Sequence, residues 1–396
     1  MKAFFRKSLL AGMALLQFSC GALSSRIIYD STNSVRRLRG GGTIQAEVDS
    51  LARPLIDHKK ISGMAVGVMT PDGVSQSFTY GFSGRPGDTK SLSENDVFQV
   101  GSVSKLFIAT VLSVLVDEGE LSYESTVREI LPAGTQLSED AGELTLYELI
   151  THTGGLPRES MGLAQLKDFT RYLFTGKNIY RYLDKAYLYK YLRSCKIKPG
   201  EKGKYRYSNI GLALLAHLIE VKTEKPFPQL AEEKIFKPLK MENTTFFLTE
   251  AQKQNLAVGH AGKKQPKFMR RHQVIEPWDM GDTMRPAGGL YSTLHDMLIF
   301  CKANLGMTDY AYQKDLLKTH IVQAHSPAED VAFGWLVNYF DNGKITLHYK
   351  HGMVSGYSAY VGLNIEKKIA VVVLMSNFEW DDEAGHNLLL RLSRAS

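Results

Sequence analysis

Ser102 and Lys105 form an S-x-x-K motif directly before the apolar run from Leu106 to Val116. If a helix begins at Ser102, the lysine lies one turn further along the same face, where its amine can reach the serine hydroxyl. A serine alone is a weak nucleophile at neutral pH, and an amine that accepts or relays its proton activates it. The apolar run predicts a helix that is buried on most sides and holds the pair rigidly. On its own, the motif is more often a helix start with Ser102 as its cap and Lys105 in solvent.

A second candidate motif is Tyr207-Ser208-Asn209, which precedes a predicted helix over residues 210–221. On an extended loop, side chains two residues apart face the same side. Tyr207 can carry a proton if nearby cations favour its phenolate, and Lys105 and Lys350 can supply that charge. Asn209 can hold a substrate amide carbonyl. A turn with a packed tyrosine and a capping asparagine is the simpler interpretation.

The third candidate motif is Lys350-His351-Gly352, directly after a predicted strand over residues 345–349. A lysine that projects into a cleft from a strand end can bind a substrate carboxylate. Gly352 lets a substrate backbone approach closely. Alone, these three residues predict little.

The elements expected to position these motifs are strands at both ends of the chain and helices between them. A helix is expected from near Thr43, the middle from about Ser102 to Asn304 is mostly helical with long loops, and a last amphipathic helix carries Leu388 to Leu392. Strands are expected over residues 63–70, 75–81, 333–340, 345–349, 359–364 and 369–376. This order predicts an α+β fold in which both termini build one antiparallel sheet, flanked by helices, and the middle forms a mostly helical lobe. The cleft between sheet and lobe is the expected place for a site.

The bulk composition is that of an ordinary globular protein. The 396 residues are 44% hydrophobic and 22% charged with a net charge of +7, enough for one large domain or two lobes. Basic residues gather near the N-terminus and between Lys263 and Arg271. We interpret these stretches as solvated segments, or as attraction to an anionic envelope polymer or lipid surface. Nothing predicts a nucleic-acid module.

Residues 1–24 have the pattern of an export signal, with Lys2, Arg6 and Lys7 before the short apolar core from Leu9 to Leu16. The signal ends in cleavage after Ala22 or in lipidation of Cys20 as in bacterial lipoproteins. Residues 25–42 are basic and end in three glycines, which predicts a flexible linker before a domain over residues 43–396. We therefore expect an exported protein, periplasmic or extracellular, or a membrane-anchored lipoprotein.

The cysteines leave two alternatives. Besides Cys20, only Cys195 and Cys301 are present. In an oxidising compartment they form a disulfide, or they are two buried free thiols. No Cys and His spacing predicts a zinc site.

Together, the three motifs resemble the S-x-x-K, Y-x-N and K-T-G motifs of the serine β-lactamase and penicillin-binding protein family. The nearest resemblance is to class C β-lactamases and their DD-carboxypeptidase, D-aminopeptidase and esterase relatives. Further segments are similar to this family, at residues 97–105, 149–157, 207–211, 238–244 and 286–293, and the likeness spans residues 45–395. The resemblance implies a β-lactamase/transpeptidase-like fold. Thr151 to Gly155 resembles a structural loop of the family, so His152 is expected to be structural rather than part of a Ser-His-acid triad.

One residue departs from the family pattern. His351 stands where the family carries the Thr of K-T-G, whose hydroxyl helps to hold the carboxylate of a penicillin or a D-Ala terminus. The imidazole of His351 can donate a similar hydrogen bond, although it is larger than a Thr side chain. Alternatively, His351 is a packed residue beside the strand. A role in penicillin hydrolysis is therefore less favoured, while Lys350 still favours a ligand that carries a carboxylate.

The resemblance implies acyl transfer through a serine acyl-enzyme without a metal or other cofactor. Ser102 attacks a carbonyl, and Lys105 or Tyr207 accepts its proton; the sequence leaves both open. The backbone N–H groups of Ser102 and Met353 form the oxyanion hole. Tyr207 then returns the proton to the leaving group, and water releases the acyl group.

The expected function is an exported serine hydrolase that acts on small-molecule or peptide acyl substrates, such as D-amino-acid peptides or esters of the cell envelope. A class C-type β-lactamase or a carboxylesterase is the alternative. An interpretation of another class is a catalytically weak penicillin-binding or scaffold protein on the same fold.

Overall fold

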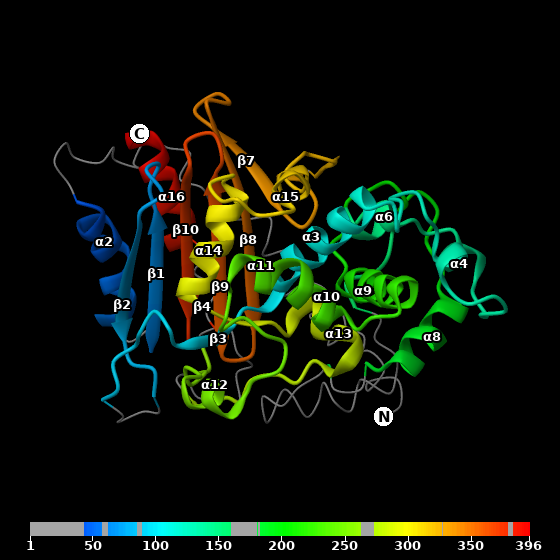
Figure 1. Ribbon diagram of the computed structural model, residues 1–396, viewed down its shortest axis with the longest axis horizontal. Coiled ribbons are helices and arrows are strands. Elements are labelled where there is room, and N and C mark those ends of the chain that lie inside the picture. The colour runs from blue at the N-terminus through cyan, green and yellow to red at the C-terminus, as the bar shows by residue number, and fades with distance from the viewer. Residues whose placement is uncertain are drawn as a thin grey trace, which may run out of the picture.

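One half of the molecule is built around an antiparallel β-sheet to which strands from both ends of the described chain contribute (Figure 1). The computed structural model describes residues 43–57, 62–84, 89–159, 180, 183–262, 273–326, 328–378 and 383–396. Within these ranges the sheet has eight strands in the order β2-β1-β10-β9-β8-β7-β6-β5. Strands β1 (Gly63–Met69) and β2 (Ser75–Gly81) join the sheet beside β10 (Ile369–Met375). The predicted α+β class and the sheet built from both termini are confirmed.

The inner strands are apolar on both faces because helices cover both sides of the sheet. Every residue of β1, of β9 (Tyr357–Asn364) and of β10 is buried. Helices α2 (Ile44–Asp57) and α16 (Glu383–Ala395) pack on one face, and α14 (Leu294–Asn304) packs on the other. The edge strand β2 instead alternates between exposed and half-buried residues, as expected for a strand with one solvated face.

The strand that carries Lys350 is longer than the sequence predicts. Strand β8 runs over Ile345–Val354, so Lys350, His351 and Gly352 lie within it and not after it. Strand β9 pairs with β8 as far as Val354, whereas β7 (Leu336–Phe340) pairs with it only as far as Tyr349. The last residues of β8 therefore keep one neighbouring strand, and their other edge faces the helical lobe. The sheet is completed by β6 (Asp330–Val331) and β5 (Ala324–His325).

The helical lobe is organised by two buried helices, α3 (Ser104–Asp117) and α9 (Asn209–Thr223). Both contact α13 (Gly281–Gly288), and nearly every residue of α3 is buried, as the apolar run predicts. Further helices in the described ranges are α4 (Val127–Ile130), α5 (Glu139–Gly142), α6 (Leu146–Ile150), α8 (Lys185–Ser194), α10 (Phe227–Ala231), the π-helical turn η2 (Glu232–Phe236), α11 (Lys237–Leu239), α12 (Glu250–Gln254) and α15 (Gln313–Lys318). A short ribbon of β3 (Val97–Gln99) and β4 (Tyr291–Thr293), which the sequence analysis missed, lies just before the S-x-x-K motif.

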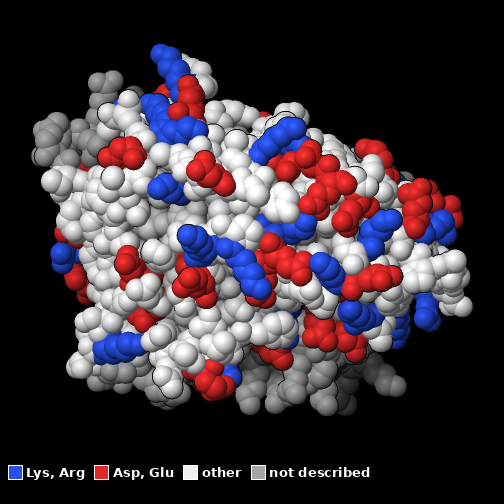
Figure 2. All heavy atoms as spheres, viewed as in Figure 1, with Lys and Arg blue, Asp and Glu red and all other residues white. Residues whose placement is uncertain are grey.

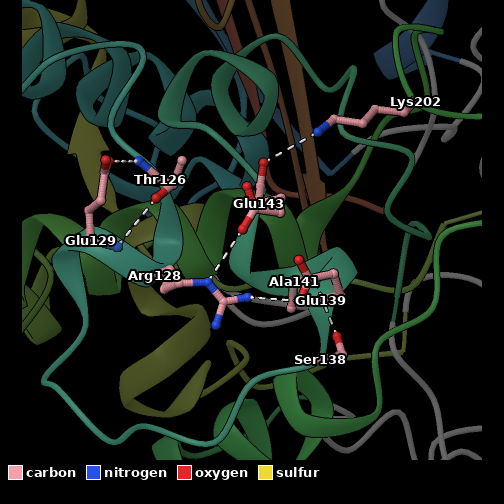
Figure 3. Close-up of polar contacts among 8 residues, drawn as sticks. All are labelled: Thr126, Arg128, Glu129, Ser138, Glu139, Ala141, Glu143 and Lys202. Atoms are coloured by element: carbon pink, nitrogen blue, oxygen red, sulfur yellow. Dashed lines mark hydrogen bonds and ion pairs between the residues drawn. The ribbon is translucent and has the colours of Figure 1, made fainter.

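Exposed polar contacts fasten the outer part of the helical lobe (Figure 3). Thr126 and Glu129 form a capping box at the start of α4. Arg128 of the same helix contacts the carboxylates of Glu139 and Glu143, and Lys202 donates to the carbonyl oxygen of Glu143. Because Lys202 belongs to the loop that leads to Tyr207, these contacts help to hold that loop against the lobe. Each exposed pair contributes about 0–1 kcal/mol.

The surface carries both signs of charge. On the face in Figure 2, acidic and basic side chains lie interspersed over the helical lobe. None of the helices that the structure describes is long and apolar enough to cross a membrane. The predicted signal over residues 1–24, the linker over residues 25–42 and the basic stretch from Lys263 to Arg271 lie outside the described residues.

Cys195 and Cys301 are free thiols, which is one of the two alternatives that the sequence left open. Cys195 follows α8 and Cys301 lies within α14, and both side chains are buried. Burial raises the pKa of both thiols, so they remain protonated and unreactive at neutral pH.

Candidate active site

The S-x-x-K motif lies on a tight turn that leads into α3. Gly101 to Val103 form one turn of 3₁₀ helix and α3 begins at Ser104, two residues later than predicted, yet the one-turn spacing is kept. The Nζ of Lys105 lies 3.0 Å from the Oγ of Ser102, and the hydroxyl of Tyr207 lies 2.8 Å from the same atom. Two predicted motifs that are about a hundred residues apart in the sequence therefore meet at one oxygen.

Lys105 is placed in an environment that favours its neutral form. Its side chain is buried, and its Nζ also donates to the carbonyl oxygen of Ala287 at 2.6 Å. Burial lowers the pKa of Lys105 to about 7, partly offset by the negative charge of Glu159. A neutral amine that donates to Ala287 still has a lone pair for the proton of Ser102.

Tyr207 is surrounded by positive charge. The centroid of its ring lies 5.4 Å from the Nζ of Lys105, 5.1 Å from the Nζ of Lys350 and 4.8 Å from the guanidinium carbon of Arg158. Three basic side chains therefore lie around the ring of Tyr207. The sequence analysis did not recognise Arg158 as part of the site.

His152 contacts the loop that carries Tyr207 and helps to fix its position. Its Nδ1 accepts a hydrogen bond from the backbone N–H of Ser208 at 3.1 Å, and its ring centroid lies 4.6 Å from that of Tyr207. Its backbone has a φ of 60°, in the left-handed region that residues other than glycine rarely adopt. Burial and the neighbouring cations hold the pKa of His152 well below its usual value, so the ring is neutral. These contacts give His152 the structural place that the sequence analysis expects.

Asn209 is the first residue of α9, and Ser208 is its N-cap. The Oγ of Ser208 accepts from the backbone N–H of Gly211, which fixes the start of the helix beside Tyr207. The Nδ2 of Asn209 donates to the carboxylate of Glu159, which the sequence analysis also missed. Arg158 and Glu159 directly follow the family-like segment that ends at Pro157, and this position was the only available signal.

Lys350 and His351 lie on opposite faces of β8, because successive side chains of a strand alternate. Lys350 is on the side of Ser102, is buried, and has a pKa lowered to about 8, chiefly by burial. His351 shares the other face with Tyr349, at 6.3 Å between ring centroids, and burial lowers its pKa to about 3. The structure thus brings Lys350 to the site and places the imidazole of His351 on the face that packs against α16.

Gly352 lets β8 lie directly against the nucleophile turn. A Cβ at this position would lie 2.0 Å from the carbonyl oxygen of Val100 and 2.9 Å from the backbone nitrogen of Ser102. A Cβ on Gly101 would in turn lie 2.8 Å from the backbone nitrogen of Met353. The glycine therefore makes room for the chain's own backbone and brings the N–H groups of Ser102 and Met353 into neighbouring segments.

The polar groups of this site carry no set of metal ligands. Across the residues that the structure describes, no three His, Cys, Asp or Glu side chains are grouped so that they could hold a metal ion.

Solved structures show the same fold. A class C β-lactamase from Rhodobacter sphaeroides matches with a TM-score of 0.72 and 22% identity, covering 87% of this chain and 98% of the other. The D-alanine carboxypeptidase AmpC from Burkholderia cenocepacia matches with a TM-score of 0.73 and 23% identity, covering 89% and 99%.

Curated proteins are similar over most of their length. The D-alanyl-D-alanine-carboxypeptidase/endopeptidase AmpH of Escherichia coli (strain K12) is 26% identical over 344 residues, which are 83% of each chain. A β-lactamase of Yersinia enterocolitica is 25% identical over 368 residues, covering 83% of this chain and 85% of its own. The sequence profile of the Beta-lactamase family matches residues 48–395. With this match over most of its length, the chain belongs to the Beta-lactamase family and is a serine hydrolase.

Proposed function

We propose that the protein is an exported DD-carboxypeptidase-like hydrolase that cleaves D-amino-acid peptides or esters of the cell envelope through an acyl-enzyme on Ser102. The observation that carries this proposal is the convergence of Lys105 and Tyr207 on the Oγ of Ser102, with the buried cation of Lys350 beside them. Its similarity to AmpH, named a D-alanyl-D-alanine-carboxypeptidase/endopeptidase, supports the choice of substrate.

In the proposed reaction, Ser102 attacks the scissile carbonyl and transfers its proton to Lys105 or Tyr207. The backbone N–H groups of Ser102 and Met353 stabilise the oxyanion, and each such donor contributes about 3 kcal/mol. Tyr207 delivers a proton to the leaving amine, and a water molecule then attacks the acyl-enzyme. Lys350 binds the substrate carboxylate, and Asn209 binds an amide of the acyl group.

The two buried lysines predict a narrow pH optimum. Lys105 with a pKa of about 7 becomes neutral, and able to accept a proton, as the pH rises through that value. Lys350 with a pKa of about 8 loses the charge that binds a carboxylate as the pH rises further. We expect kcat/KM for a peptide ending in D-Ala-D-Ala to rise through about pH 7 and to fall above about pH 8.

The variant Lys350→Arg tests the assignment of the falling limb. An arginine stays charged throughout this range, so the variant should lose the falling limb and keep the rising one. An unchanged falling limb in a folded Lys350→Arg protein would contradict the proposed role of Lys350.

The substrate class is tested by two measurements on the full chain. We expect release of D-Ala from Nα,Nε-diacetyl-L-Lys-D-Ala-D-Ala, and a covalent adduct on Ser102 by mass spectrometry after incubation with a fluorescent penicillin. A stable adduct together with D-Ala release supports a penicillin-binding peptidase. If a folded protein shows neither D-Ala release nor an adduct, the proposal is refuted, and an esterase or the catalytically weak binding protein is favoured.

A β-lactamase is the second candidate, because curated relatives such as that of Yersinia enterocolitica carry that name. The absence of the Thr hydroxyl at His351 and the position of its ring weaken this alternative. Loss of the free penicillin without a stable adduct would favour it.

Export and a lipid anchor on Cys20 are proposals from residues 1–24. Cell fractionation with a Cys20→Ser variant tests them, because only a protein anchored through Cys20 is released from the membrane by this change.

A further inference from the structure

Glu159 is a carboxylate at the site that the proposed reaction does not use. It is half-buried, and its Oε1 accepts hydrogen bonds from the Nδ2 of Asn209 and, at 2.9 Å, from the hydroxyl of Tyr180. Within the described part of the chain, no hydrogen bond or ion pair reaches its Oε2. Among the described residues, half of this carboxylate therefore lacks a partner, beside a residue to which we assign the acyl group of the substrate.

Tyr180, whose hydroxyl donates to this carboxylate, packs against a second aromatic ring. The ring of Tyr180 meets that of Trp278 edge to face, with 5.4 Å between centroids. The backbone of Trp278 is fixed to the side chain of Gln99, which accepts from its N–H at 3.1 Å and donates to its carbonyl at 2.8 Å. Gln99 is the last residue of β3, just before the turn that carries Ser102, so these bonds fix the position of Trp278 relative to that turn.

Among the residues that the structure describes, no lysine or arginine forms an ion pair with Glu159. Burial raises its pKa, whereas the hydrogen bond from Asn209 and the charges of Arg158 and Lys105 partly oppose this shift. The Nζ of Lys105 is instead bonded to Ser102 and to the carbonyl oxygen of Ala287. Desolvating a carboxylate is unfavourable unless a cation or donors satisfy it, so a ligand that supplies a cation at this place would be stabilised.

We propose that Glu159, together with Tyr180 and Trp278, forms a subsite for a protonated primary amine on the acyl group of the substrate. The subsite lies beside Asn209 on α9, whereas the carboxylate-binding Lys350 belongs to β8. The enzyme would thus prefer acyl donors with an ammonium group on the acyl side and a carboxylate on the other. This inference rests on the proposed function and names its substrate class.

Ampicillin and benzylpenicillin test this subsite, because they differ by one primary amine on the acyl side chain. In the wild type, ampicillin should acylate Ser102 about tenfold faster than benzylpenicillin does. A rate difference of this size is expected from one partly desolvated ion pair. In Glu159→Gln this ratio should fall to about one, since the amide keeps the shape and the acceptor for Asn209 and Tyr180 but carries no charge. Glu120→Gln is the control: it removes the same charge from an exposed residue beyond the far end of α3, ~20 Å away along the helix, and should keep the ratio.

The outcomes separate this inference from the proposed function. A wild-type ratio near one, or an undiminished ratio in Glu159→Gln, overturns the subsite while Ser102 chemistry stands. If neither penicillin acylates Ser102, the subsite is tested by calorimetry with the Ser102→Ala variant. The measurement compares the affinity for Nα-acetyl-L-Lys-D-Ala-D-Ala, which has a free side-chain amine, with that for the same peptide acetylated at Nε. Preference for the free amine, lost in the Glu159→Gln double variant, then supports the subsite without the proposed hydrolysis; equal or absent binding overturns it.

Discussion

Replacing Ser102 by alanine should reduce hydrolysis of acyl substrates by at least about 10⁴-fold, because no other group can form the acyl-enzyme. The change deletes only the Oγ that Lys105 and Tyr207 share, at a half-buried position on the turn before α3. No apolar side chain loses volume, so the melting temperature should stay within a few degrees of the wild type. The measurements are D-Ala release, penicillin labelling by mass spectrometry, and thermal unfolding of the same preparation.

Ser104 offers a matched control two residues away. Its buried Oγ donates to the carbonyl oxygen of Gly101 and accepts from the N–H of Leu290, so its role is to hold the turn. Ser104→Ala should lower the free energy of unfolding by about 1–3 kcal/mol, as expected when a buried N–H loses its partner, yet keep labelling of Ser102. Wild-type turnover by Ser102→Ala would refute the mechanism, and loss of labelling only in Ser104→Ala would move the nucleophile there.

Local spacing in the sequence predicted the contact between Lys105 and Ser102, whereas Tyr207 was added through the family resemblance. An interval of three residues before an apolar helix brings Lys105 to Ser102 whether the first turn is α-helical or 3₁₀, so the error in the helix start did not matter. The apolar runs of β1 and β10 likewise identify strands buried on both faces, whichever strands they pair with.

Other features depend on contacts between distant segments, which one sequence does not reveal. The extent of β8 is set by β9, which continues to pair beyond the point where β7 ends. The need for glycine at position 352 arises from the carbonyl oxygen of Val100, about 250 residues earlier. Arg158 and Glu159 acquire meaning only when their loop is folded against Tyr207 and Asn209. The identity of the residues could not indicate any of these contacts.

Tyr207→Phe should lower kcat and kcat/KM together by about 10²–10⁴-fold, with little change in KM, because it removes a proton donor and acceptor used only during the reaction. The ring and its contacts with Lys105, Lys350 and Arg158 would remain. Tyr205→Phe removes a hydroxyl from the same loop, one that forms no hydrogen bond within the described residues, and should keep full activity. Equal rates for wild type and Tyr207→Phe would remove this residue from the chemistry.

The pH profile of Tyr207→Phe decides which group is the base. If Lys105 accepts the proton of Ser102, the residual activity of the variant should still rise through about pH 7, because the titration of Lys105 is set mainly by its own burial. If Tyr207 is the base, the variant has lost the proton acceptor, and its residual activity should no longer rise through about pH 7. A limb that persists near pH 7 in Tyr207→Phe and vanishes in Lys105→Met would assign the base to Lys105, and Tyr207 would then act mainly as the acid that protonates the leaving group.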